Sequence, residues 1–295
     1  MSDELRFESR PQLERPVLIA AFRGWNDGGQ GASLAGAYLA RAWAAIEFAS
    51  IDPENFYDFQ ATRPMVSLEE GLTRKVEWPE NTFFHAPLPG GGRDAIILLG
   101  VEPNLRWRTF SELITGLARD LGVELVLTLG SLLADVPHTR PSPVTGSASD
   151  PELIDRLGLQ ASRYEGPTGM VGVLHDACSR AGLQSASLWA AVPHYVSLTP
   201  SPRAAKALVD RLGALLGADI DTAELDEAAD AYAQQVSEAV AADEETQSYV
   251  QDLERRVDEL SEEADLPSGD ALAAELTRFL RERENGHDGD DVARG

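Results

Sequence analysis

The sequence predicts an α/β protein in which a mostly parallel β-sheet carries helices on both faces. Two observations predict this class. Short apolar runs that end at Gly or Pro alternate with amphipathic stretches of about 10 to 15 residues, which is the pattern of β-α-β units. The 295-residue chain is 43% hydrophobic, with 25 Gly and one Cys. That composition is typical of a globular protein and excludes disordered, collagen-like and disulfide-framework chains.

Four apolar runs predict buried strands, and a helical stretch follows each of them. The predicted strands span 17–22, 95–99, 123–129 and 185–192. The predicted helices span 31–45, 110–121, 169–181 and 201–216. Pro202 at the start of the last helix and Gly217 after its end match the usual asymmetry of helix termini. Residues 48–87 carry aromatic and β-branched side chains in short pieces between prolines, which predicts two or more strands at a sheet edge.

Acidic residues are concentrated in the last quarter of the chain. The net charge is −24, and residues 221–295 hold 23 acidic against 6 basic residues. We therefore divide the chain into a core domain over 1–220, an acidic helical extension over 221–284 and a disordered tail over 285–295.

The extension predicts one long charged helix over 222–266, a break at 267–270 and a last helix over 271–283. The apolar positions of the long helix are Leu225, Tyr232, Val236, Val240, Tyr249, Leu253, Val257 and Leu260. This stripe packs either on the chain's own core or on a partner or second copy, and its spacing leaves both open.

Charge and composition also exclude several classes of partner. A net charge of −24 disfavours nucleic acid and anionic membranes. No apolar run reaches the roughly 18 residues of a membrane span, and residues 1–15 lack the apolar stretch of a signal peptide. A single Cys fits a reducing compartment, so we expect a cytoplasmic protein. No His, Cys, Asp or Glu cluster has metal-ligand spacing, so we expect neither a metal nor a cofactor.

Ligands of parallel sheets bind beyond the carboxyl ends of the strands. That rule selects the loops over 23–31, 100–109, 130–147 and 193–200. In the first loop, Gly24, Asn26, Asp27, Gly28 and Gly29 are ligand-binding candidates, because a Gly-rich turn at a helix N-terminus can hold an anion. The alternative is a tight turn in which Asn26 or Asp27 caps the following helix, since the spacing matches neither the dinucleotide nor the phosphate-loop fingerprint.

The loop over 130–147 carries the candidate catalytic residues. Asp135 and His138 could form an acid–base pair with Ser131 as nucleophile, and Arg140 could hold a carboxylate or phosphate. Ser131 does not stand in a Gly-x-Ser-x-Gly turn. The alternative is an ordered loop whose His and Arg bond to backbone carbonyls or to a neighbouring subunit.

Two further loops carry candidates. His194 is a ligand-binding candidate in the same crevice, with packing against Tyr195 as the alternative. Arg106, Trp107 and Arg108 could stack a base or clamp an anion. In a chain this acidic, a protein interface is the favoured interpretation of those three residues.

Four segments in this order resemble the proteasome assembly chaperone family of the second type, in particular its actinobacterial branch. They are 22–29 (FRGWNDGG), 99–104 (LGVEPN), 130–141 (GSLLADVPHTRP) and 188–196 (LWAAVPHYV). The resemblance implies a three-layer α/β/α core similar to the nucleoside phosphorylase and peptidyl hydrolase fold. It also implies a non-catalytic role, since archaeal and eukaryotic members are assembly chaperones that bind proteasome subunits.

The leading hypothesis is a non-catalytic, homo-oligomeric protein-interaction or assembly-chaperone-like factor. Its partner would be a protein, with a proteasome-related protein as one candidate, and trimeric relatives of the fold favour a trimer by analogy. A second hypothesis is a hydrolase- or phosphorylase-class enzyme. A third is an anion- or nucleotide-binding sensor. Both alternatives would use the loops over 23–31 and 130–147.

Overall fold

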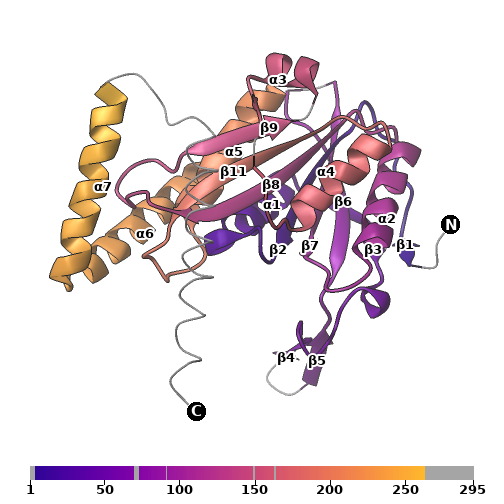
Figure 1. The fold of residues 1–295 in the computed structure, drawn as a ribbon. Helices are drawn as coiled ribbons and strands as arrows, with labels where there is room; N and C mark the ends of the chain where they lie inside the picture. The colour runs from indigo at the N-terminus through magenta and orange to yellow at the C-terminus, as the bar shows by residue number, and fades with distance from the viewer. Residues whose placement is uncertain (1–3, 70–72, 91, 149, 163, 263–295) are drawn as a thin grey trace, which may run out of the picture.

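The computed structural model describes residues 4–69, 73–90, 92–148, 150–162 and 164–262. These residues form one nine-stranded sheet with helices on both faces, and a separate two-stranded hairpin, β4–β5 (Figure 1). The order of the large sheet is β1-β3-β6-β7-β2-β8-β11-β9-β10. The strands are β1 (Leu5–Phe7), β2 (Val17–Arg23), β3 (Ile46–Ile51), β4 (Met65–Glu69), β5 (Thr73–Glu77), β6 (Asn81–Pro87), β7 (Asp94–Val101), β8 (Leu125–Ala134), β9 (Val144–Ala148), β10 (Gln160–Ala161) and β11 (Ser185–Pro193).

The four predicted core strands form the parallel centre of the sheet. β7, β2, β8 and β11 are parallel neighbours, and the antiparallel strands β6 and β9 flank them. On β2, the side chains of Val17, Ile19 and Ala21 enter one core, whereas Leu18, Ala20 and Phe22 enter the other. Such a strand is covered on both faces, which explains why its sequence is apolar at every position from Val17 to Phe22.

Helices cover both faces of the sheet, and the sheet separates the two cores. The helices are α1 (Gly31–Ala42), α2 (Trp107–Asp120), α3 (Pro151–Leu157), α4 (Met170–Arg180), α5 (Pro202–Leu216), α6 (Ala223–Ala241) and α7 (Glu244–Glu262). Buried residues of α1 and α5 belong to one core, and those of α2 and α4 belong to the other. The predicted three-layer α/β/α arrangement is confirmed.

The edges of the sheet hold elements that the sequence predicts only in part. The segment over 48–87 contributes β3 and β6 to one edge, as predicted, but β4 and β5 pair with each other outside the large sheet. At the other edge, β9, α3 and β10 were not predicted. Because β8 runs to Ala134 and β9 begins at Val144, the predicted loop over 130–147 is irregular only over 135–143.

The prediction of one long helix over 222–266 is wrong. The chain turns at Ala242 and Asp243, where the Asp243 carboxylate accepts hydrogen bonds from the Thr246 amide and hydroxyl and caps the start of α7. The turn brings the apolar side chains of both helices to the loop after β11. The described part of the extension thus packs on its own core, one of the two alternatives above.

Parts of the predicted organisation lie outside the described residues, namely the last helix over 271–283 and the tail over 285–295. The domain boundary between 220 and 221 stays a prediction. Among the described helices, none has the length and apolarity needed to traverse a bilayer.

Candidate functional site

The carboxyl ends of β2, β7, β8 and β11 lie at the same edge of the sheet, where the four predicted loops meet. The first loop pairs with the end of β8. Asp27 and Ser131 form a parallel bridge, and the Ser131 amide donates a 2.9 Å hydrogen bond to the Asn26 carbonyl.

Asp27 caps α1 through its side chain. One carboxylate oxygen accepts hydrogen bonds from the amides of Ala32 (2.9 Å) and Ser33 (3.1 Å) and from the Ser131 hydroxyl (3.3 Å). The other accepts from the Ser33 hydroxyl at 2.6 Å. Burial raises the pKa of Asp27, and these hydrogen bonds oppose that rise. Ser131 is 1% exposed and is fixed by the same contacts.

Asn26 and Glu102 hold the N-terminus of a different helix, α4. The Met170 amide donates to Glu102 Oε1 at 2.6 Å, and the Val171 amide donates to Asn26 Oδ1 at 3.4 Å. Glu102 Oε2 also accepts from the Trp25 amide at 3.0 Å. Sequence reasoning assigned Glu102 no role, although a carboxylate directly after a buried strand is a visible signal.

The candidate glycines lie against neighbouring strands. Gly24 (φ 147°) and Gly29 (φ 58°) have backbone conformations that favour glycine. A Cβ on Gly29 would lie 2.8 Å from Val192 Cγ1, and one on Gly28 would lie 3.1 Å from the Leu132 Cα. The glycines therefore let this loop pack closely on β8 and β11.

His138 is 2% exposed and lies in a chain of hydrogen bonds. Its amide donates to the Tyr195 hydroxyl at 2.8 Å, and the same hydroxyl lies 2.8 Å from His138 Nδ1. His138 Nε2 lies 3.0 Å from Ser237 Oγ, which donates to the Ala233 carbonyl. This pattern assigns the proton of a neutral imidazole to Nε2. Burial lowers the pKa of His138, which favours that neutral form.

Asp135 joins the loops after β8 and β11 to α7. Its Oδ1 atom accepts a 2.7 Å hydrogen bond from the Tyr249 hydroxyl and lies 3.1 Å from His194 Nδ1. The rings of His138, His194, Tyr195 and Tyr249 form a cluster with centroids 5.6 to 6.0 Å apart between neighbours. His194 therefore lies beside the 135–143 loop, and it also packs on Tyr195.

Arg140 binds α7 through two parallel hydrogen bonds. Its Nε and Nη2 atoms donate to the two carboxylate oxygens of Asp258 at 2.8 and 2.7 Å, the bidentate geometry typical of Arg–carboxylate pairs. Glu254 lies 3.6 Å from Arg140 Nη1. Together with the contacts of His138 and Asp135, this pair attaches the 135–143 loop to both helices of the extension.

The three catalytic candidates have different neighbours. Ser131 faces Asp27 and α1, His138 faces Tyr195 and α6, and Asp135 faces Tyr249 and His194. A Ser-His-Asp mechanism needs the nucleophile on one imidazole nitrogen and the carboxylate on the other. In this structure Tyr195 and Ser237 occupy those two positions on His138.

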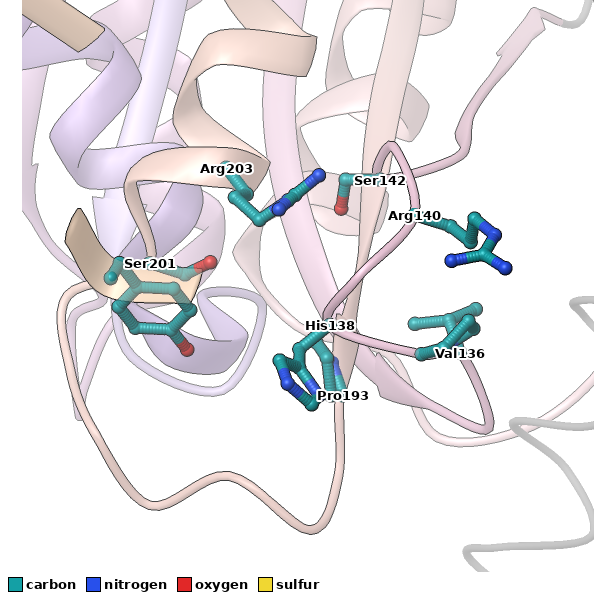
Figure 2. A pocket seen from close by; sticks show the side chains of 9 residues that line it. Val136, His138, Arg140, Ser142, Pro193, Ser201 and Arg203 are labelled. Atoms are coloured by element: carbon teal, nitrogen blue, oxygen red, sulfur yellow. The ribbon is translucent and has the colours of Figure 1, made fainter. Parts of the chain in front are cut away.

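His138 and Arg140 also line a small pocket beside α5 (Figure 2). Its volume of about 10 Å³ has room for about one water molecule. Arg203, which sequence reasoning missed, points across this pocket toward Ser142, whereas Arg140 points away (Figure 2). Burial lowers the pKa of Arg203. The other lining residues are Val136, Pro137, Pro193, Ser201 and Tyr232.

The predicted interface residues precede and open α2. Arg106 pairs with Glu4 and lies over the Phe56 ring. Trp107 donates from Nε1 to the Pro103 carbonyl at 2.6 Å, whereas Arg108 is exposed. Of the three, Arg108 is the side chain most available to another molecule.

The comparisons with known proteins agree with this fold. A model of the PAC2 family matches residues 21–240. The chain belongs to the PAC2 family. The predicted resemblance to proteasome assembly chaperones, actinobacterial ones included, is therefore confirmed. No curated protein matches the chain.

Three solved structures are similar to this PAC2 chain. A PAC2 family protein from Streptomyces avermitilis is 47% identical, with a TM-score of 0.74 over 80% of this chain and 99% of that one. A proteasome-assembly chaperone homologue from Mycobacterium tuberculosis is 44% identical, with a TM-score of 0.72 over 79% of this chain and 99% of that one. A second M. tuberculosis protein, of unknown function, is 29% identical, with a TM-score of 0.82 over 96% of this chain and 97% of that one.

Proposed function

We propose that this PAC2 chain is a non-catalytic, homo-oligomeric protein-interaction factor that acts in the manner of an assembly chaperone, with proteasome subunits as its partners. Membership of the PAC2 family supports the proposal. So does the 44% identity to a protein described as a proteasome-assembly chaperone homologue. We extend the proposal to a cytoplasmic location, which the single Cys of the chain supports.

One structural observation supports the part of the proposal that assigns the chain no catalytic activity. The polar groups of the 135–143 loop bond to the chain's own helices: His138 to Ser237, Asp135 to Tyr249 and Arg140 to Asp258. An active site presents such groups to a substrate-sized cavity, whereas here they hold α6 and α7 on the core.

The carboxyl edge of the sheet offers a surface for a protein partner. Trp25 and Leu105 follow the neighbouring strands β2 and β7, and each is 49% exposed. Large apolar side chains fixed at half exposure are typical anchors of protein interfaces. The Glu102 carboxylate fixes the backbone beside Trp25.

The test mixes the purified chain with purified, unassembled proteasome α-type subunits from the same organism and follows complex formation by native mass spectrometry. We expect a complex that a Trp25→Ala, Leu105→Ala variant loses. Ile46→Ala is the matched control, because Ile46 is 62% exposed at the start of β3, on the opposite edge. Absence of a complex with the wild-type chain, or equal loss with Ile46→Ala, would contradict the proposal.

One observation favours a second candidate, an anion sensor. Arg203 carries a partly desolvated guanidinium at a pocket with room for about one water molecule, or for one oxygen atom of a phosphate whose other oxygens stay outside. Phosphate would then raise the melting temperature of the wild-type chain more than that of Arg203→Gln, at matched ionic strength. Equal shifts in both proteins would exclude this sensor.

A further inference from the structure

The helix α7 lies beyond α6, at the side of the molecule, and buries few apolar side chains (Figure 1). Among its described side chains, Val250 and Leu253 are buried, at 4% and 2% exposure. The helix α5, by comparison, buries six of its 15 residues. Because burial of apolar surface supplies most of the free energy that holds a helix on a core, α7 is attached less firmly than α5.

The polar contacts of α7 with the body have the composition of a protein–protein interface. Tyr249 donates to Asp135, and Asp258 accepts two hydrogen bonds from Arg140. Clustered aromatic rings and bidentate Arg pairs are typical of transient interfaces between proteins or domains. We call the surface beneath α7 the helix-docking face, and its residues are Asp135, Thr139, Arg140, His194 and Tyr195.

Two features of the extension favour release of α7 from this face. Residues 241–246 contain neither Gly nor Pro, and Ala242 keeps right-handed helical angles (φ −82°, ψ −9°), so α6 and α7 can join into one straight helix. The sequence of α6 holds five acidic residues and no basic one, and that of α7 holds seven acidic and two basic residues. Two helices of like charge repel each other when they lie side by side, and straightening moves them apart.

The contacts of α7 define the kind of ligand that the helix-docking face accepts. The helix presents a Tyr, an apolar side chain four positions later and an Asp nine positions later, at Tyr249, Leu253 and Asp258. The phenol meets Asp135 and the carboxylate meets Arg140. A basic side chain in place of the carboxylate would face a like charge at Arg140. The face therefore selects an acidic amphipathic helix.

We propose that the helix-docking face binds an acidic amphipathic helix of a partner protein, and that α7 occupies the face until that helix displaces it. Proteins commonly recognise an amphipathic helix through such a face. Because a short turn tethers α7, its effective concentration at the face is on the order of millimolar. A partner overcomes this advantage when it is also held at a second contact, and Trp25 and Leu105 at the same edge of the sheet offer one.

The proposal rests on the protein-interaction part of the proposed function and names a second surface for it. The first test adds a fluorescein-labelled peptide of residues 243–262 to the full-length chain and measures binding by fluorescence anisotropy. We expect Leu253→Asp, which frees the face, to bind the peptide at least tenfold more tightly than the wild-type chain. Gln251→Asp, which adds the same charge on the exposed side of α7, should bind as the wild type does. No binding to Leu253→Asp, or equal binding by both variants, would overturn the proposal.

A charge exchange tests the contact with Arg140. The peptide with Asp258→Arg should bind the Leu253→Asp chain at least tenfold more weakly than the native peptide does. It should regain affinity for a chain that carries both Leu253→Asp and Arg140→Asp, because opposite charges then meet again. Equal affinities of the two peptides for both chains would overturn the proposal.

A pattern peptide tests whether the face recognises the chemistry of a helix or α7 alone. This peptide keeps the residues that match Tyr249, Val250, Leu253, Glu254 and Asp258 and carries Ala or Gln at all remaining positions. We expect the Leu253→Asp chain to bind it within about threefold of the native peptide. Loss of binding would restrict the face to α7 and would overturn recognition of a partner helix.

The last test uses the wild-type chain, so that a misfolded variant cannot decide the outcome. A saturating amount of the pattern peptide should speed amide hydrogen exchange in α7 severalfold, because a displaced helix loses its protection. Exchange in β2 and β8 should stay the same. Unchanged exchange in α7 would mean that the peptide binds elsewhere and would overturn the proposal.

Native mass spectrometry separates a partner helix from α7 of a second copy. We expect the same number of chains in the wild-type and Leu253→Asp assemblies. A smaller number in Leu253→Asp would assign the face to α7 of a second copy and would overturn the proposal. Each of these failures would leave the proposed binding of α-type subunits standing, because that binding is tested through Trp25 and Leu105.

Discussion

Tyr249 of α7 donates a 2.7 Å hydrogen bond to Asp135, although 114 positions separate them in the sequence. The accepting oxygen also lies 3.1 Å from His194 Nδ1. One carboxylate thus joins the loop after β8, the loop after β11 and the extension. Through this carboxylate, α7 contacts the strand ends of the sheet.

Removal of the Tyr249 hydroxyl should loosen α7. Tyr249→Phe keeps the ring cluster but loses the bond to Asp135, at a cost of about 0.5–1.5 kcal/mol. We expect faster amide hydrogen exchange in α7 while exchange in β2 and β8 stays unchanged. Gln251→Ala, on the exposed face of α7, is the control. Unchanged exchange in Tyr249→Phe would show that the hydrogen bond does not hold the helix.

The Arg140–Asp258 pair should make attachment of α7 sensitive to salt. Arg140→Asp and Asp258→Arg should each speed exchange in α7, because each places like charges within the pair. The double variant, which restores a pair of opposite charges, should partly restore the protection of α7 amides from hydrogen exchange. High salt should shrink the difference between single and double variants, since both side chains are partly exposed. The same difference at low and high salt would contradict an electrostatic attachment.

His175 should make stability depend on pH. It lies between Ser185 and Thr128, 2.8 and 3.2 Å from their hydroxyl oxygens, and burial lowers its pKa from 6.5 to about 4. The folded state then binds fewer protons than the unfolded state, so this stability is present above about pH 6.5 and is lost as the pH falls toward 4. The advantage of the wild-type chain over His175→Gln in urea unfolding should therefore shrink between pH 7 and 4.5. If the wild-type chain were more stable than His175→Gln by the same amount at every pH, protonation of His175 would not be coupled to unfolding.

Two glycine substitutions should have opposite effects. A Cβ on Gly169 would lie 2.0 Å from Asn26 Oδ1 and 2.6 Å from Glu102 Oε1, so Gly169→Ala should cost about 1–3 kcal/mol. Gly116 lies inside α2 with open space around it, so Gly116→Ala should stabilise by about 0.4–1 kcal/mol. Thermal unfolding measures both. Equal changes would show that the contact at α4 is relaxed in solution.

The sequence predicts the sheet well because its signals are local. Each predicted central strand is mostly apolar, and each predicted loop begins where such a strand ends. The elements missed have weaker signals. Asp150 and Pro151 mark the start of α3 as an N-cap and a first-turn proline. The strands β9 and β10 are short, so their sequences carry little strand signal. The turn between α6 and α7 contains neither Gly nor Pro. Helix propensity alone therefore predicts that one helix continues through Ala242 and Asp243.

The candidate site is predictable only in its location. The loop residues Asp27, Asp135 and His138 lie where the carboxyl-edge rule puts them. Their partners could not be predicted, because Ser237, Tyr249 and Asp258 come from about 100 or more positions away and no local pattern reports such contacts. The turn after β2 illustrates the limit: of the two residues that could cap the next helix, Asp27 does so, whereas the Asn26 side chain reaches α4.

The distance along the chain from β11 to Tyr249 also sets an order of events during synthesis. A ribosome finishes the strands of the sheet before it reaches α7, because translation runs from the amino end. At about 5–20 residues per second, the strand ends wait several seconds for the helices that bind them. During that interval the α7 side chains that bind Asp135 and Arg140 are not yet made, and any molecule that recognises these two residues competes with α7.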